Sequence, residues 1–164
     1  MTTIAFDGRL LAADSLLFAE DLKFGTCDKI TQLSKDTWMA TAGDAALEPI
    51  VAEWLRPLVP KSNWLAKAIA STPEILKDEE ILGLIVTCRR GVVSAWELSN
   101  MRIYPVRGLW GGGSGEVVAM TAMHLGKSAI GALRVACALD RNTGYPVMAV
   151  DVTTGEVHTV QAKE

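Results

Sequence analysis

Short runs rich in hydrophobic residues occur at both ends of the chain and in its middle; the first one alternates, whereas Ile81 to Cys88 is a continuous apolar stretch of the length of a buried strand. These runs predict β-strands at residues 2–6, 9–13, 27–33, 37–41, 81–87, 92–97, 147–152 and 156–160. Three pairs of consecutive runs are joined by turn-forming residues, which are Asp7-Gly8, Arg90-Gly91 and Thr154-Gly155. For Asp7-Gly8 we expect a two-residue type I′ hairpin, which needs positive φ at both central residues.

Other segments carry hydrophobic residues at steps of three and four, which is typical of helices. The clearest one covers residues 44–58, where Pro57 and Pro60 limit the end of the helix. A weaker helix is predicted at 64–70, and two more at 116–125 and 128–139, with Ser128 as the expected N-cap. We expect Trp54 and Trp64 to fill the core or subunit contacts, because both lie in these segments.

The predicted elements come in the order strands, helices, strands, helices, strands. This grouping predicts a layered α+β domain, in which antiparallel sheets are covered by helices. With 164 residues and no linker or repeat, we expect one domain spanning residues 1–164. The run of glycines at 111–113 is interpreted as a tight turn before a helix, because no Gly-Lys-Ser/Thr follows it as in a phosphate-binding loop.

Composition narrows the class of function. The chain is 49% hydrophobic and 21% charged, which is typical of a folded globular protein. Its net charge is −3, from 16 basic and 19 acidic residues, so nothing favours a nucleic acid or an anionic membrane as partner. No apolar stretch has membrane-spanning length, and residues 1–14 lack the basic start and apolar run of a secretory signal.

Cysteine and histidine give no metal or cofactor site. The three cysteines, at 27, 88 and 137, are odd in number and lack ligand spacing, which favours reduced thiols in a cytosolic, hence cytoplasmic, protein. His124 and His158 are isolated in the sequence. We therefore expect no metal and no cofactor. Cys27 has no histidine nearby in the sequence, which argues against a thiol protease.

The start of the chain offers a nucleophile. Methionine before a small residue is normally removed, so Met1-Thr2 predicts a mature chain that begins at Thr2. An N-terminal threonine combines a hydroxyl nucleophile with its own α-amine as general base. The same opening also occurs in chains where it has no catalytic meaning.

Two charged residues could complete such a site. Asp14 follows the second predicted strand, and Lys29 begins the next one. In an antiparallel sheet both can return to the start of the chain, where the Lys29 ammonium would lie near Thr2 and Asp14 would orient it. The alternative interpretation is that each is a solvated surface charge.

Five segments resemble, in order, those of proteasome β-subunits and HslV, which are N-terminal-nucleophile hydrolases. They are TTIAFDGRLLAADS at the start, CDKITQL, WMATAGDA, WGGGSGE, and residues 140–144, similar to an Asp-x-x-Ser-Gly segment. The resemblance extends over the whole chain. It implies a four-layer αββα sandwich of the N-terminal-nucleophile hydrolase type.

The resemblance also assigns roles. Thr2 is the nucleophile and its amine the base; Lys29 lowers the pKa of that amine, and Asp14 holds Lys29. The backbone N–H of Ala40, where the family usually has glycine, donates to the oxyanion. The network around the Thr2 amine contains Ser114, Asp140 and Thr143, the last in place of the family's usual serine.

The implied function is that of a threonine-type endopeptidase that is compartmentalised in stacked homo-oligomeric rings. Its substrate would be unfolded polypeptide, supplied by an ATP-dependent unfoldase partner as for HslV. Two alternatives stay open: a catalytically inactive ring-forming scaffold subunit, and an N-terminal-nucleophile amidohydrolase that acts on small amides. Retention of Met1 would favour the scaffold.

Overall fold

The first five-stranded sheet contains the start and the end of the chain. The structure is a computed structural model and describes residues 2–19 and 22–162. The sheet has the order β10-β1-β2-β11-β12, and each pair in it is antiparallel. Its strands are β10 (Trp110–Gly113), β1 (Thr3–Phe6), β2 (Leu10–Asp14), β11 (Val147–Asp151) and β12 (Val157–Val160). The strand that follows Thr2 therefore lies inside this sheet, between β10 and β2.

The second five-stranded sheet is a meander in chain order. It contains β5 (Ile30–Ser34), β6 (Thr37–Ala42), β7 (Leu82–Arg89), β8 (Val92–Ser99) and β9 (Arg102–Val106), all antiparallel. A two-stranded hairpin of β3 (Leu16–Ala19) and β4 (Leu22–Thr26) connects the two sheets.

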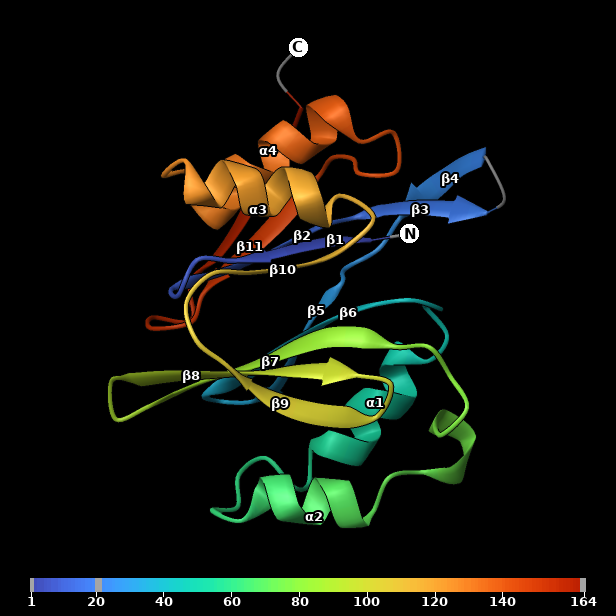
Figure 1. Ribbon diagram of the computed structural model, residues 1–164, viewed down its shortest axis with the longest axis vertical. Helices are drawn as coiled ribbons and strands as arrows, with labels where there is room; N and C mark the ends of the chain where they lie inside the picture. Colours follow the sequence, from blue (N-terminus) through green and yellow to red (C-terminus); the bar gives the residue numbers. More distant parts are fainter. Residues whose placement is uncertain (1, 20–21, 163–164) are drawn as a thin grey trace.

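Helices cover the outer face of each sheet (Figure 1). The helices α3 (Glu116–His124) and α4 (Ala129–Leu139) pack on the first sheet, and α1 (Glu48–Leu55) and α2 (Trp64–Ala70) on the second. A short 3₁₀ helix, η1 (Glu74–Leu76), precedes β7. The expected fold class, α+β with antiparallel sheets covered by helices, is confirmed.

Strand alternation divides the core into three hydrophobic clusters. On β1, Ile4 and Phe6 point into the cluster between the two sheets, whereas Ala5 points toward α3 and α4. Ala12 of β2 also faces these helices. Alanine on the helix-facing side lets α4 pack closely on the sheet, because a larger side chain would hold the layers apart.

The longest predicted helix starts later than its hydrophobic pattern. Residues 44–47 form turns, in which the Asp44 carboxylate accepts the Ala46 N–H at 2.9 Å and the Asp44 carbonyl accepts the Leu47 N–H at 3.1 Å. The helix α1 then begins at Glu48, with a proline in its first turn, where the missing N–H has no cost. Trp54 and Trp64 are buried, at 8% and 4% exposure, as expected.

The first hairpin turn differs from the prediction. Gly8 has a φ of 97°, but Asp7 does not have positive φ, so the turn is not type I′. Instead, the Asp7 side chain accepts the N–H groups of Arg9 at 3.0 Å and Leu10 at 2.8 Å. The tight turn is thus centred on Gly8-Arg9, with Asp7 as its side-chain cap. At the second hairpin both Arg90 and Gly91 have positive φ, as a type I′ turn requires.

The glycine run at 111–113 is not a loop, and this corrects the sequence interpretation. It belongs to β10, which pairs with β1 in the register Thr3 with Gly113 and Phe6 with Trp110. A Cβ on Gly113 would lie 1.8 Å from the Thr2 carbonyl oxygen, and its φ is 90°. Only glycine allows so close an approach with this backbone. The pattern of residues did not predict β10 because strands rarely contain such runs.

Some elements carried no usable signal in the sequence. The strands β3, β4 and β9 were not predicted; β9 contains a proline, which is unusual inside a sheet and is tolerated at an edge. By contrast, Ser128 is the N-cap of α4 as expected, and it accepts the Gly131 N–H at 3.2 Å. Across the described residues, the structure contains no helix that is both long and apolar enough to cross a membrane.

The buried carboxylate of Asp151 at the end of β11 makes stability depend on pH. It accepts Arg9 Nε at 2.7 Å and the Thr153 N–H at 2.9 Å, and the Arg9 hydrogen bond holds the pKa of Asp151 well below its usual range. Because the folded pKa is depressed, the stabilisation is complete above a pH of about 4, the ordinary value for aspartate, and is lost as the pH falls through the folded pKa.

We therefore expect Asp151→Asn to lower the free energy of unfolding at pH 7 and to remove part of its decline below pH 4. Urea unfolding followed at pH 7, 5, 4 and 3 measures both effects. Asp78→Asn, on an exposed residue, is the matched control. Parallel pH curves for the wild type and Asp151→Asn would contradict this role of the carboxylate.

Candidate active site

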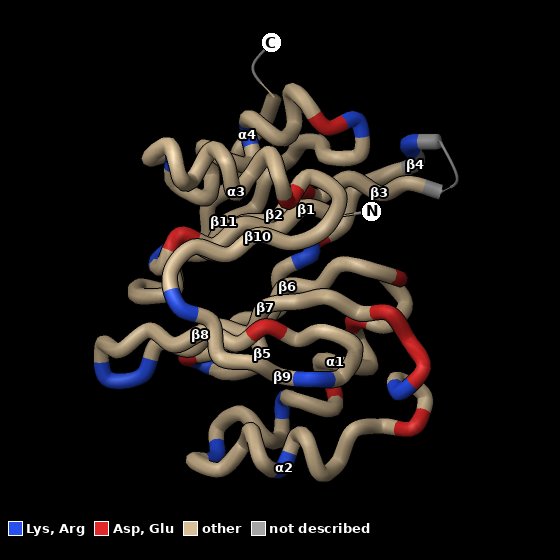
Figure 2. Tube along the Cα trace, in the orientation of Figure 1, with Lys and Arg blue, Asp and Glu red and all other residues tan. Residues whose placement is uncertain are grey.

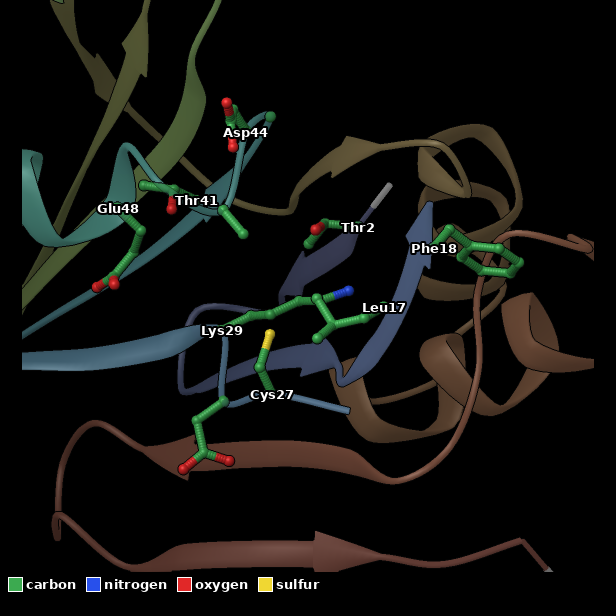
Figure 3. A pocket seen from close by; sticks show the side chains of 11 residues that line it. Thr2, Leu17, Phe18, Cys27, Lys29, Thr41, Asp44 and Glu48 are labelled. Carbon is green, nitrogen blue, oxygen red and sulfur yellow. The ribbon is translucent and has the colours of Figure 1, made fainter. Parts of the chain in front are cut away.

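Thr2 directly precedes β1 and lies at the wall of a pocket of about 450 Å³ (Figure 3). It is only 6% exposed, and its carbonyl accepts the Ser114 N–H at 2.9 Å. This bond extends the β1–β10 ladder by one residue, so the backbone of Thr2 is held as part of a sheet. The pocket is open beside its side chain.

Lys29 lines the same pocket and is paired with Asp14. Its ammonium donates to Asp14 Oδ1 at 3.0 Å and to the Leu16 carbonyl at 2.7 Å. The side chains of Lys29 and Asp14 are 6% and 0% exposed. In Figure 3 the Lys29 side chain extends toward Thr2. The interpretation of these two residues as solvated surface charges is therefore wrong.

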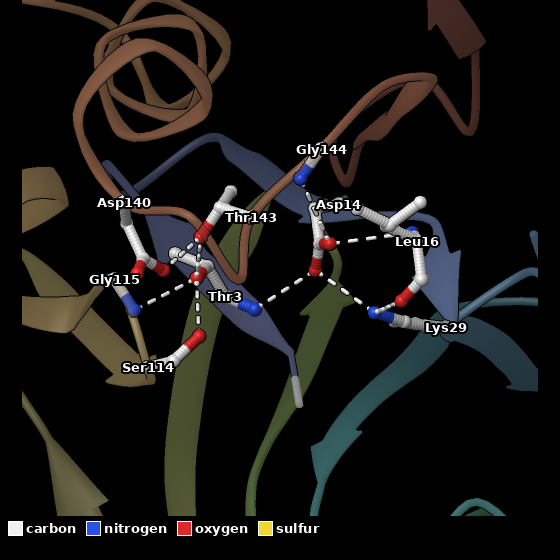
Figure 4. A network of polar contacts seen from close by, with 9 residues as sticks. All are labelled: Thr3, Asp14, Leu16, Lys29, Ser114, Gly115, Asp140, Thr143 and Gly144. Carbon is white, nitrogen blue, oxygen red and sulfur yellow. Dashed lines mark hydrogen bonds and ion pairs between the residues drawn. The ribbon is translucent and has the colours of Figure 1, made fainter. Parts of the chain in front are cut away.

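The Asp14 carboxylate collects donors from four parts of the chain (Figure 4). Oδ1 accepts the Thr3 N–H at 2.9 Å as well as Lys29, and Oδ2 accepts the N–H groups of Leu16 at 3.2 Å and Gly144 at 3.3 Å. A buried carboxylate needs such partners, because burial of an unpaired charge costs several kcal/mol. Asp14 thus fixes Lys29 and the first peptide of β1 relative to each other.

A second network surrounds the hydroxyl of Thr3. This hydroxyl accepts the Gly115 N–H at 2.9 Å and lies 2.5 Å from Thr143 Oγ1 and 3.4 Å from Ser114 Oγ. Thr143 Oγ1 is 2.5 Å from Asp140 Oδ2. Since a hydroxyl has one hydrogen and the carboxylate only accepts, Thr143 donates to Asp140 and Thr3 donates to Thr143. The hydrogen bonds therefore run in one direction, toward Asp140.

The centre of this network is the Thr3 hydroxyl, whereas the sequence predicted a network around the Thr2 amine. Ser114, Asp140 and Thr143 do come together, but they meet at the Thr3 hydroxyl, and their contact with the Thr2 amine stays a prediction. The sequence reasoning missed Thr3. Its position beside Thr2 in a buried strand, as a polar residue among apolar ones, was the available signal.

Ala40 is fully buried in the middle of β6, paired with Ile30 and Leu84. Its neighbour Thr41 lines the pocket, as do Gly43 and Asp44 at the end of the strand. The strand that contains Ala40 therefore reaches the pocket. That its N–H stabilises an oxyanion stays a prediction.

Cys27 also places a nucleophilic group at the pocket wall. Burial raises the pKa of its thiol, so the thiol is protonated at neutral pH and is a poor nucleophile. Within the described part of the chain, His, Cys, Asp and Glu form no group of three or more that could hold a metal ion. The wall of the pocket thus combines the Thr2 hydroxyl with the Lys29 ammonium.

Comparison with known proteins adds no assignment. The chain matches no protein-family model, and a search of curated proteins finds no match. The geometry of the site is therefore the observation that bears on function.

Loss of the Asp14 charge should weaken the fold strongly. Asp14→Asn leaves the Lys29 ammonium buried without its counter-charge, and breaking a buried pair costs roughly 3–5 kcal/mol. Urea unfolding at pH 7 measures this loss. Asp78→Asn, which removes an exposed carboxylate, should change the free energy of unfolding by less than about 0.5 kcal/mol. Equal effects of the two substitutions would show that the buried pair does not stabilise the protein.

Proposed function

We propose that this protein is a threonine-type endopeptidase whose nucleophile is the Thr2 hydroxyl after removal of Met1. One observation carries the proposal: Thr2 and Lys29 line one pocket, and Lys29 is held there by the buried carboxylate of Asp14. A hydroxyl beside a fixed ammonium fits nucleophilic attack on a carbonyl, because the cation stabilises negative charge as it develops near the oxygen.

In the proposed reaction, Thr2 Oγ attacks the carbonyl carbon of a peptide bond. The hydroxyl proton passes to the α-amine of Thr2, directly or through a water molecule, and then to the leaving amine as the C–N bond breaks. The Ala40 N–H donates to the oxyanion. The acyl-enzyme ester is then hydrolysed by water, with the amine again as base, which releases the carboxylic acid and restores the hydroxyl.

The arrangement of layers supports placing the protein among N-terminal-nucleophile hydrolases. Helices α3 and α4, the sheet that contains β1, the sheet that contains β6, and helices α1 and α2 follow one another (Figure 1). We propose that this is the αββα sandwich of that class. The candidate residues lie at the end of the sandwich where β1 begins, close to where β6 ends.

Assembly into homo-oligomeric rings is part of the proposal, with unfolded polypeptide as substrate and an ATP-dependent unfoldase as possible partner. An apolar groove of about 300 Å³ between α3 and α4 supports burial against other copies. Val117, Leu125 and Leu139 line it and are 77%, 79% and 72% exposed. An apolar surface of this kind is typical of protein interfaces.

The nucleophile is tested by substitutions at Thr2. We expect Thr2→Ala to lower kcat/KM for fluorogenic peptides by at least about a thousandfold, as loss of a nucleophile does, whereas Thr2→Ser keeps a hydroxyl and retains measurable activity. Thr159→Ala, which removes an exposed threonine hydroxyl from β12, away from the pocket and from α3 and α4, should leave the activity unchanged.

Intact mass and N-terminal sequencing of the same preparations show whether the chain begins at Thr2. A chain that still carries Met1 after expression with an active methionine aminopeptidase, and that hydrolyses no peptide, would contradict the peptidase. It would favour the scaffold subunit instead.

Ring assembly is tested by the solution mass. We expect sedimentation equilibrium to give a molecular mass that is an integer multiple of the 17.6 kDa chain, as for a closed ring of identical subunits. Leu125→Glu together with Leu139→Glu places charges in the apolar groove and should lower that mass without lowering the melting temperature of the subunit. A monomer at all concentrations would exclude the rings.

A further inference from the structure

The charges that line the Thr2 pocket are unbalanced. Its described wall contains three carboxylate side chains, from Asp28, Asp44 and Glu48. The one cationic side chain of that wall is Lys29, and the Asp14 carboxylate neutralises its charge in a direct ion pair. The pocket therefore presents an excess of negative charge to a ligand, although its apolar and polar parts are otherwise mixed.

Two of the three acidic residues lie on one side of the nucleophile. Figure 3 shows Asp44 and Glu48 with Thr41 on one side of Thr2, and Phe18 on the other side. On the Phe18 side, the Lys23 ammonium lies 5.9 Å from the centre of the aromatic ring. A peptide that crosses the pocket past Thr2 would meet an acidic half on one side and the Phe18 ring with the Lys23 ammonium on the other.

Glu48 is the best placed of these carboxylates. It is half-buried in the first turn of α1, and the Thr31 hydroxyl donates a hydrogen bond to its Oε1. This contact orients the side chain. A carboxylate has about four acceptor sites, so one hydrogen bond leaves capacity for a cationic ligand. Because Glu48 is less exposed than Asp44, its charge is less screened by solvent.

A run of acidic residues adds to the negative potential at the rim. Asp78, Glu79 and Glu80 follow one another before β7, and Figure 2 shows this segment in red. Its backbone lies close to the turn after β6, because a Cβ on Gly43 would lie 3.0 Å from the Glu80 carbonyl oxygen. Gly43 itself lines the pocket.

We infer that the pocket selects a cationic side chain, arginine or lysine, of an extended peptide, and that Glu48 is the main specificity-determining residue. The guanidinium or ammonium would enter the acidic half, next to the peptide bond that Thr2 attacks. This inference rests on the proposed peptidase function and adds the substrate class. Complementary charge of this type favours one partner over its neutral analogue by differential affinity.

The experiment compares two labelled peptides that are identical except for one residue, arginine in the first and its neutral isostere citrulline in the second. Binding is measured by fluorescence anisotropy with the full chain carrying Thr2→Ala, which cannot cleave. Hydrolysis is measured with the unmodified protein. We expect the arginine peptide to bind and to be cleaved roughly five- to tenfold better at low salt, and this preference to shrink as salt screens the charges.

Substitution of Glu48 then locates the preference. Glu48→Gln keeps an acceptor for the Thr31 hydroxyl and removes the charge, so the ratio between the two peptides should fall toward one. Glu48→Lys should favour a peptide with glutamate at the variable position. Glu53→Gln is the matched control, because Glu53 is an exposed residue of the same helix and does not line the pocket.

The outcomes separate this inference from the proposed function. Cleavage of both peptides at equal rates, with equal binding, would overturn the cationic specificity and leave the peptidase intact. A binding preference for arginine that Glu48→Gln abolishes, without hydrolysis of either peptide by the unmodified protein, would support the recognition and overturn the peptidase. An unchanged preference in Glu48→Gln would overturn the role of Glu48.

Discussion

The candidate site is held together by one buried carboxylate, which requires hydrogen-bond donors around it. Asp14 is fully buried, and a charge in that position is tolerated only with partners around it. Its four donors come from the first peptide of β1, from Leu16, from Lys29 and from Gly144. Segments that are far apart in the sequence therefore converge at the end of one strand. Removal of this anion would release the cation beside Thr2 and the loop after α4 together.

Local sequence patterns predicted much of the fold. The hydrophobic runs of β1, β2, β7, β8 and β11, and the helical spacing of α2, α3 and α4, depend mainly on which faces each segment buries, and such patterns are visible in the residues themselves. The glycine strand β10 was not predicted. Its glycines are required because the Thr2 backbone and the Trp110 side chain lie too close to them for a side chain to fit, and this closeness arises only when β10 pairs with the distant strand β1. Contacts of that kind leave no periodicity in the sequence.

For the candidate site, too, the individual residues could be predicted from the sequence but the contacts between distant segments could not. Asp14, Lys29, Ser114, Asp140 and Thr143 were each singled out from short motifs, and the structure joins them in two adjacent networks. The residue that links the networks, Thr3, was not singled out. Its N–H binds Asp14 and its hydroxyl binds Thr143, so it belongs to both. This link depends on the directions in which the N–H and the hydroxyl of Thr3 point. Those directions are defined only once the sheet has formed.

The bond between the Thr2 carbonyl and the Ser114 N–H affects how a ligand would be bound. It makes the proposed nucleophile a member of a β-ladder, although chain termini are usually among the most mobile parts of a protein. The conformational entropy of that residue has therefore been lost during folding. A ligand that enters the pocket meets a backbone that is already ordered, and the free energy of ordering is not subtracted from its affinity.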